Sequence, residues 1–127
     1  MNHKTAILMT IAATLAVAAI GTASRGAVTA APKGYVIAEL TVTDPQAYKQ
    51  YAAAVPPILA RFGGKYLVRG GQTVGVEGDP PGGRIVVIEF DSLAAAKSFE
   101  ESHEYQEIAQ VRHQAANGRV FLAEGVN

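Results

Sequence analysis

Hydrophobic residues follow a strand-like pattern in several stretches of the chain. Three of these stretches are predicted to be strands, at residues 35–42, 84–90 and 120–123, and the first is rich in β-branched residues. A further strand is expected at residues 65–69, followed by a tight turn at Gly70-Gly71 and a short returning strand at residues 73–77. The apolar run at 84–90 is nearly continuous, which is typical of a central strand with both faces covered.

The segments between these strands carry hydrophobic residues three to four positions apart, as an amphipathic helix does. The first helix is expected to begin with Asp44 as the cap and Pro45 at the first helical position. Pro56 and Pro57 predict a break or kink, because a proline has no amide hydrogen to donate to the preceding turn. A short further helical turn is expected to end at Gly63-Gly64.

A second helical region follows the strand at 84–90. Asp91 or Ser92 is expected to cap one helix, and Ser102 is expected to cap another that ends at Asn117-Gly118. The resulting order predicts a ferredoxin-like βαββαβ sandwich of the α+β class with an antiparallel sheet. Helices would cover only one face of this sheet, so we expect a second copy of the chain to cover the other face.

Charge and composition divide the chain into two parts. Lys plus Arg and Asp plus Glu each number 11, which argues against a broad basic surface for nucleic acid. Residues 1–30 contain no acidic residue, and an apolar run at 6–20 is followed by small residues that suit a signal peptidase. We therefore expect a signal peptide at 1–30 and a domain at 31–127, exported to the periplasm or secreted. An uncleaved membrane anchor and a buried helix are the alternatives for this leader.

Several segments of the mature part resemble one family. They are residues 33–38, 43–48, 61–71, 86–90 and 102–105. Together they resemble domain-of-unknown-function family thirteen-thirty, which lies within the dimeric α+β-barrel superfamily, and the resemblance covers about residues 33–126. It implies a ferredoxin-like subunit that pairs into a dimeric barrel. It implies no particular reaction, because that superfamily includes cofactor-free monooxygenases, isomerases, haem enzymes and sensors.

Charged residues within the predicted strands are the first candidates for chemistry. Alternation places Glu39 and Glu89 on the sheet face that points away from the helices. We expect their two strands to be parallel neighbours at the centre of the sheet, with Arg69 within reach of one carboxylate. The three side chains could form an ion-pair network at a dimer interface. Alternatively, the two carboxylates could share a proton and act as a general base, with Arg69 orienting an anionic substrate.

Histidine and tyrosine supply the remaining candidates. His103 follows Ser102 at a helix start and is either a surface residue or a proton-transfer group. Tyr48, Tyr51 and Tyr105 have the spacing of core residues, but a buried hydroxyl needs a partner that a ligand can supply. The chain has no cysteine, and we expect neither a metal site nor a tightly held cofactor.

These observations favour an exported homodimer that binds a small organic molecule. The first alternative is a cofactor-independent enzyme of the monooxygenase or isomerase type, with Glu89, Glu39 or His103 in acid–base roles. The second is a structural or partner-binding dimer without a ligand. Nucleic acid is not an expected partner, and the membrane is one only if the leader stays uncleaved.

Overall fold

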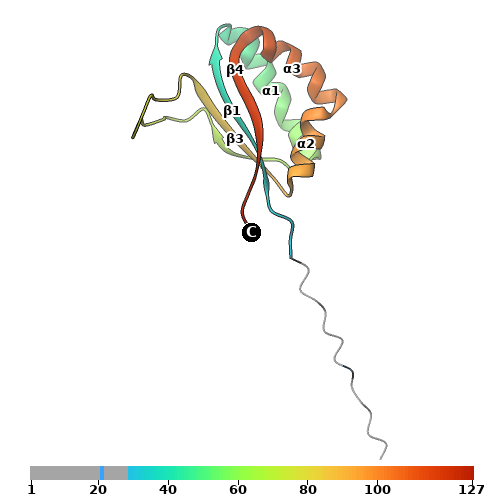
Figure 1. Ribbon diagram of the computed structural model, residues 1–127. Helices are drawn as coiled ribbons and strands as arrows, with labels where there is room; N and C mark the ends of the chain where they lie inside the picture. Colours follow the sequence, from blue (N-terminus) through green and yellow to red (C-terminus); the bar gives the residue numbers. More distant parts are fainter. Residues whose placement is uncertain (1–20, 22–28) are drawn as a thin grey trace, which may run out of the picture.

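One antiparallel sheet covered on a single face by three helices makes up the fold (Figure 1). The computed structural model describes residue 21 and residues 29–127. The strands stand in the order β2-β3-β1-β4. The elements are β1 (Gly34–Val42), α1 (Pro45–Arg61), β2 (Lys65–Arg69), β3 (Arg84–Phe90), α2 (Leu93–Glu101), α3 (His103–Ala115) and β4 (Ala116–Glu124). The α+β class and the antiparallel sheet are therefore as the sequence predicts.

The leader predicted at 1–30 falls outside the described residues, apart from Gly21 and residues 29–30. Within the part that the structure describes, no helix has both the length and the apolar character that crossing a membrane requires.

The two central strands, β1 and β3, run antiparallel. The expectation that they are parallel was wrong, and the topology explains why. The crossover through α1 returns β2 parallel to β1, and β3 then runs back against β2. β3 is therefore antiparallel to both of its neighbours, β1 and β2. This direction places Glu89 of β3 beside Tyr35, near the beginning of β1.

The hydrophobic core lies between the sheet and the helices. The side chains of β1 and β3 alternate as predicted, and one set on each strand is buried under the helices. From the helices, Val55, Leu59, Phe99 and Ala109 pack against this layer. The buried strand residues are Val36, Ala38, Leu40, Val86, Ile88 and Phe90.

Each helix begins at the residue that the sequence indicates. Asp44 accepts a hydrogen bond from the backbone amide of Ala47 at 3.1 Å, and Ser92 accepts one from Ala95 at 3.1 Å. Ser102 ends α2 and begins α3, since its hydroxyl donates to the carbonyl of Phe99 and accepts from the amide of Tyr105. Ser102 thus separates α2 from α3 and sets the turn between these two helices.

The predicted break at Pro56-Pro57 is absent, and α1 continues through both residues to Arg61. Pro56 has no amide hydrogen to donate to the carbonyl of Ala52, four residues earlier. The guanidinium of Arg69 donates to that carbonyl instead, at 2.9 Å. A side chain of β2 thus satisfies the acceptor that the proline leaves free, which is a physical reason why the helix persists.

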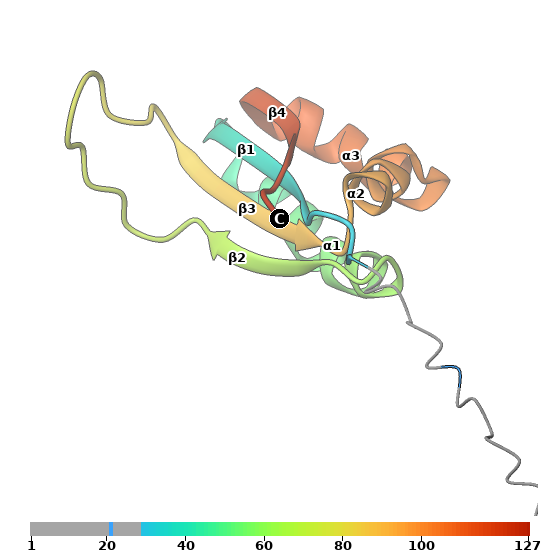
Figure 2. The same ribbon diagram turned by 60° about the horizontal axis from the view of Figure 1, so that its bottom comes forward.

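The strand predicted at 73–77 is also absent. Gly70 has a positive φ of 68° and donates its amide to Ile85 at 2.8 Å, and beyond this point the chain leaves the sheet. Residues 70–83 form an irregular arm that projects beyond the strands (Figure 2). Its two valines, Val74 and Val76, are 76% and 95% exposed. The outer edge of β2 therefore has no strand beside it in the described part of the chain.

Candidate functional site

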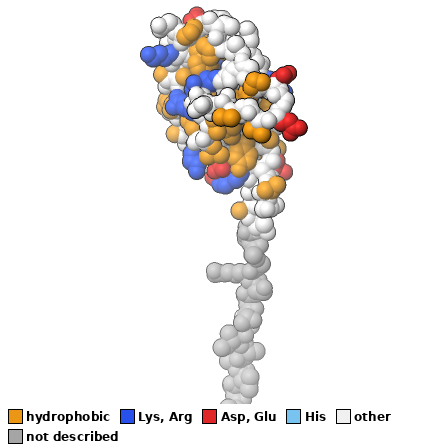
Figure 3. Space-filling model, turned by 90° about the vertical axis from the view of Figure 1, so that its left-hand side faces the viewer, with side chains coloured by type: hydrophobic (Ala, Val, Ile, Leu, Met, Phe, Trp, Pro, Cys, Tyr) orange, Lys and Arg blue, Asp and Glu red, His pale blue; other side chains and the backbone are white. Residues whose placement is uncertain are grey.

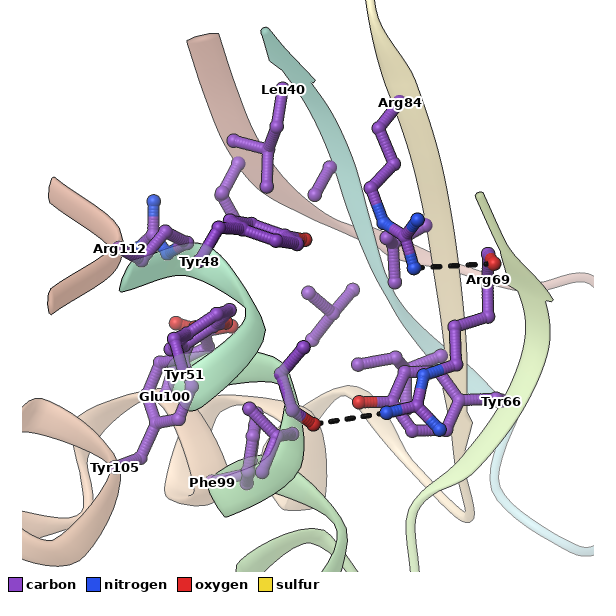
Figure 4. A pocket seen from close by; sticks show the side chains of 17 residues that line it. Leu40, Tyr48, Tyr51, Tyr66, Arg69, Arg84, Phe99, Glu100, Tyr105 and Arg112 are labelled. Atoms are coloured by element: carbon purple, nitrogen blue, oxygen red, sulfur yellow. Dashed lines mark hydrogen bonds between the residues drawn. The ribbon is translucent and has the colours of Figure 1, made fainter. Parts of the chain in front are cut away.

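A cavity lies between the helix-covered face of the sheet and helices α1, α2 and α3. Its volume is about 30 Å³, which is room for about two water molecules. Apolar residues of β1, β3 and α1 form much of its wall, and polar side chains complete it. The polar and aromatic lining residues are Tyr48, Tyr51, Tyr66, Arg69, Arg84, Phe99, Glu100, Tyr105 and Arg112 (Figure 4).

The three tyrosines predicted as ligand-binding residues all line this cavity. Tyr48 and Tyr51 come from α1, and Tyr105 comes from the first turn of α3. The hydroxyls of Tyr51 and Tyr105 lie 3.0 Å apart and share one hydrogen bond. Burial raises the pKa of both hydroxyls above that of free tyrosine, so both remain protonated at neutral pH.

Glu100 and Arg112 also line the cavity, and the reasoning from sequence missed both. Burial raises the pKa of the Glu100 carboxyl to about 7, and the positive charge of Arg112 opposes this rise only in part. A carboxyl with a pKa near neutrality can both accept and release a proton under physiological conditions. The sequence holds one weak signal for this position, namely that Glu100 directly follows the core residue Phe99 in a helix.

Arginine side chains occur at both ends of the cavity. In Figure 4, Arg69 and Arg84 lie on one side, and Arg112 lies on the other with Glu100. Each guanidinium sits over a tyrosine ring, at 4.4 Å for Arg69 on Tyr66, 5.6 Å for Arg84 on Tyr48 and 6.0 Å for Arg112 on Tyr51. Arg69, predicted from sequence as a ligand-binding residue, is therefore brought together with the predicted tyrosines.

Three buried side-chain atoms of the described residues have no hydrogen-bond partner. They are Nε of Arg84, Oε1 of Glu100 and Nε of Arg112. All three residues line this cavity. Buried polar groups in folded proteins nearly always have a partner, so these atoms indicate a place that a water or a ligand completes.

Glu39 and Glu89 lie on the open face of the sheet and not in the cavity. The antiparallel register sets Glu39 opposite Ile85 and Glu89 opposite Tyr35. The two positions are four residues apart along β1, or roughly 13 Å at about 3.3 Å per residue. The expected carboxylate pair is therefore not formed.

Each of the two carboxylates has other partners. Glu39 pairs with Arg119 at 3.3 Å. Glu89 accepts a hydrogen bond from the hydroxyl of Tyr35 at 3.3 Å and lies 3.8 Å from the ammonium of Lys65. Neither carboxylate pairs with Arg69, whose side chain points to the other face of the sheet.

His103 is the first residue of α3 and is not among the cavity-lining residues. Its side chain is exposed, with Nε2 lying 3.1 Å from the carboxylate of Glu107 one turn later. Within residues 29–127, no group of three or more His, Asp or Glu side chains is placed to hold a metal ion.

The fold and the cavity define an α+β, ferredoxin-like domain with a polar, tyrosine-lined site beneath its sheet. Residues 33–126 match the family described as Domain of unknown function (DUF1330), and the chain belongs to that family. Among proteins with curated descriptions, none matches the chain significantly.

Three solved structures, of two different proteins, share this fold. The methylated RPA0582 protein has 19% sequence identity and a TM-score of 0.60, over 76% of this chain and 83% of that chain. A second structure of RPA0582, a protein of unknown function from Rhodopseudomonas palustris, has 20% sequence identity and a TM-score of 0.55, over 78% of this chain and 85% of that chain. SnoaB, a cofactor-independent oxygenase from Streptomyces nogalater, has 15% identity and a TM-score of 0.51, over 76% of this chain and 96% of that chain. At these identities the likeness concerns the fold alone.

Proposed function

We propose that the protein binds a small organic molecule in the cavity between its sheet and its helices. One observation carries this proposal: the buried polar atoms of the described residues that lack a partner belong to Arg84, Glu100 and Arg112, which all line the same cavity. Apolar walls with a few converging polar groups are the usual composition of a small-molecule site. The cavity holds about two waters, so a larger ligand enters by displacing a side chain at its edge. Arg69 is exposed and lines the cavity, and we propose that its side chain is the one that moves when the ligand enters.

Tyrosine fluorescence provides a direct assay of binding. The chain has no tryptophan, and four of its five tyrosines line the cavity. A panel of small organic acids, phenols and their neutral analogues is titrated into the purified protein. We expect at least one compound to change the emission in a saturable manner.

Two matched variants show whether such binding occurs in the cavity. Ala52 lines it, whereas the neighbouring Ala53 is exposed on the same helix. Ala52→Val reduces the free space and should weaken binding about tenfold or more, while Ala53→Val, with the same helix propensity, should leave binding unchanged. Equal effects of the two substitutions, or no saturable ligand in the panel, would refute the proposal and favour a structural dimer.

A cofactor-independent enzyme of the monooxygenase or isomerase type is the second candidate. The specific observation in its favour is the Glu100 carboxyl, whose pKa burial raises to about 7, in the same cavity as the Tyr51–Tyr105 hydroxyl pair. SnoaB, a cofactor-independent oxygenase, shares the fold. In this function Glu100 takes a proton from the bound molecule and returns it in a later step.

Conversion of a bound compound, followed by mass spectrometry, tests this second function. Glu100→Gln should retain binding and lower the rate of conversion by about 100-fold or more, the usual contribution of a general acid–base. Glu101→Gln, at the exposed neighbouring position, serves as the control. The absence of conversion for every compound that binds would leave the binding function alone.

We also propose that the protein is a homodimer in which a second copy covers the open face of the sheet. Hydrophobic side chains gather on this side of the molecule, with charged side chains around them (Figure 3). Phe121 of β4 and Val68 of β2 are 44% and 39% exposed there, and Ile37 and Val87 lie between them. All three helices lie on the other face, so a partner sheet is the natural cover.

Light scattering at micromolar concentration tests the dimer. Phe121→Glu places a charge at one end of this apolar row and should convert the protein to a monomer. Val126→Glu, at a position that is 95% exposed near the C-terminus, should not. A monomeric mass for the unmodified protein would overturn the dimer.

Export is the last element of the proposed function. The acid-free leader with its apolar run at 6–20 supports a cleaved signal at 1–30. The intact mass of the protein recovered from the cell envelope or the medium tests this directly. Retention of the N-terminal methionine and the whole leader would refute cleavage.

A further inference from the structure

We infer that the ligand of the cavity carries an anionic oxygen group and that Arg84, together with Arg69, binds this group. The inference rests on the proposed binding function and specifies the chemical class of its ligand. It depends on the partners of the arginine side chains and on the geometry that holds Arg84 in place.

In residues 29–127, the two arginines outside the cavity are paired with carboxylates, whereas those of the cavity are not. Arg61 pairs with Glu104, and Arg119 pairs with Glu39. Among the described residues, no carboxylate forms an ion pair with any of the three arginines that line the cavity, namely Arg69, Arg84 and Arg112. Half-buried charges in proteins are normally paired, so the half-buried guanidinium of Arg84 lacks a negative partner. Arg69 is exposed and adds a second positive charge on the same side of the cavity.

The positive charge is least balanced at one end of the cavity. Arg112 shares its end with the Glu100 carboxyl, which is partly ionised near neutral pH. Arg69 and Arg84 share the other end (Figure 4), and the only acceptors they have in the described part are backbone carbonyls. Arg69 donates to Ala52 at 2.9 Å, and Arg84 donates to the carbonyl of Arg69 at 3.3 Å.

Arg84 also retains a free donor in a defined position. Its Nε is buried without an acceptor. The guanidinium packs against Gly70, where a Cβ would overlap it and where the φ of 68° suits glycine. The backbone therefore leaves space for this guanidinium and orients its Nε–H group. A carboxylate or similar oxyanion supplies the acceptor that fits such a donor.

Acetate and acetamide test the inference, because they have the same shape and differ in charge. Both are small enough to replace the water that the cavity can hold. Each is titrated at constant ionic strength, because exposed charges respond to salt. The Nε–H resonance of Arg84 is followed by ¹H–¹⁵N NMR, after assignment by its loss in Arg84→Lys.

We expect acetate to shift the Arg84 Nε–H resonance and to bind about tenfold more tightly than acetamide, as a charge-assisted hydrogen bond requires. Arg84→Gln should abolish this preference. Arg61→Gln, at an exposed arginine outside the cavity, should retain it.

Three kinds of result would overturn the inference. Equal affinities for acetate and acetamide would show that the site does not select charge, and the proposed binding function would still stand. A preference for acetate that survives Arg84→Gln would place the anion elsewhere. If neither compound perturbs Arg84 or the cavity tyrosines, the anion site is wrong, and the Ala52→Val and Ala53→Val comparison then decides the binding function separately.

Discussion

Replacement of the cavity carboxyl should make the stability of the protein less dependent on pH. Burial raises the pKa of Glu100 from the 4.5 of a free glutamate to about 7 in the folded protein. The folded state therefore binds the proton more tightly than the unfolded state does. The contribution of Glu100 to stability is most favourable below pH 4.5, where this group is protonated in both states, and it falls as the pH rises from 4.5 through about 7. Above that pH the loss is complete.

The size of this effect follows from the shift. One pKa unit corresponds to about 1.4 kcal/mol, so ionised Glu100 destabilises the folded protein by about 3 kcal/mol above neutral pH. Glutamine has the shape of the protonated side chain and never ionises. Glu100→Gln should thus leave the free energy of unfolding nearly unchanged at pH 4 and raise it by about 3 kcal/mol at pH 8.

Urea denaturation of the unmodified protein and the Glu100→Gln variant, at a series of pH values and one protein concentration, measures this difference. Glu101→Gln is the matched control, because Glu101 is exposed and its ion pair with Lys97 spans 3.7 Å at the surface. Its substitution should change stability by less than about 1 kcal/mol at every pH. Parallel pH profiles for the unmodified protein and Glu100→Gln would show that this carboxyl is solvated in the folded protein, and the reasoning would be wrong.

Two further predictions concern the arginines at the other end of the cavity. Arg69→Met should lower the free energy of unfolding by about 1 kcal/mol, and by less than half of that in a Pro56→Ala background, where the amide of residue 56 can again donate to Ala52. A urea double-mutant cycle that shows no coupling between the two substitutions would contradict this account of the helix. Gly70→Ala should cost about 1–2 kcal/mol because of the positive φ. It should also weaken acetate binding by displacing Arg84, and unchanged binding would show that Gly70 does not position that side chain.

Local rules predicted much of the fold from the sequence. The caps at Asp44 and Ser102 and the alternation along β1 depend on residues close in the chain, so they could be identified without coordinates. The prediction of a break at Pro56 was wrong, because Arg69, which replaces the missing amide donor, comes from a strand distant in the sequence. The predicted direction of β3 relative to β1 was wrong for a similar reason, since that direction depends on how α1 and β2 connect the two strands.

The site was only partly predictable. Tyr48, Tyr51 and Tyr105 were identified because buried hydroxyls need partners, and they do line one cavity. Glu100 and Arg112 were missed because their burial depends on how α2 and α3 pack on the sheet, which no local pattern specifies. Glu39 and Glu89 were paired in error, because their separation depends on the direction of β3.

The main claim is that the cavity between sheet and helices holds a ligand, and its most direct test is a crystal structure of the protein, both as purified and after soaking with each compound that changes the tyrosine emission. We expect density for a molecule other than water inside this cavity, in contact with at least one of the polar atoms of Arg84, Glu100 and Arg112 that lack a protein partner. Ordered water alone, satisfying these polar atoms in every crystal, would contradict it.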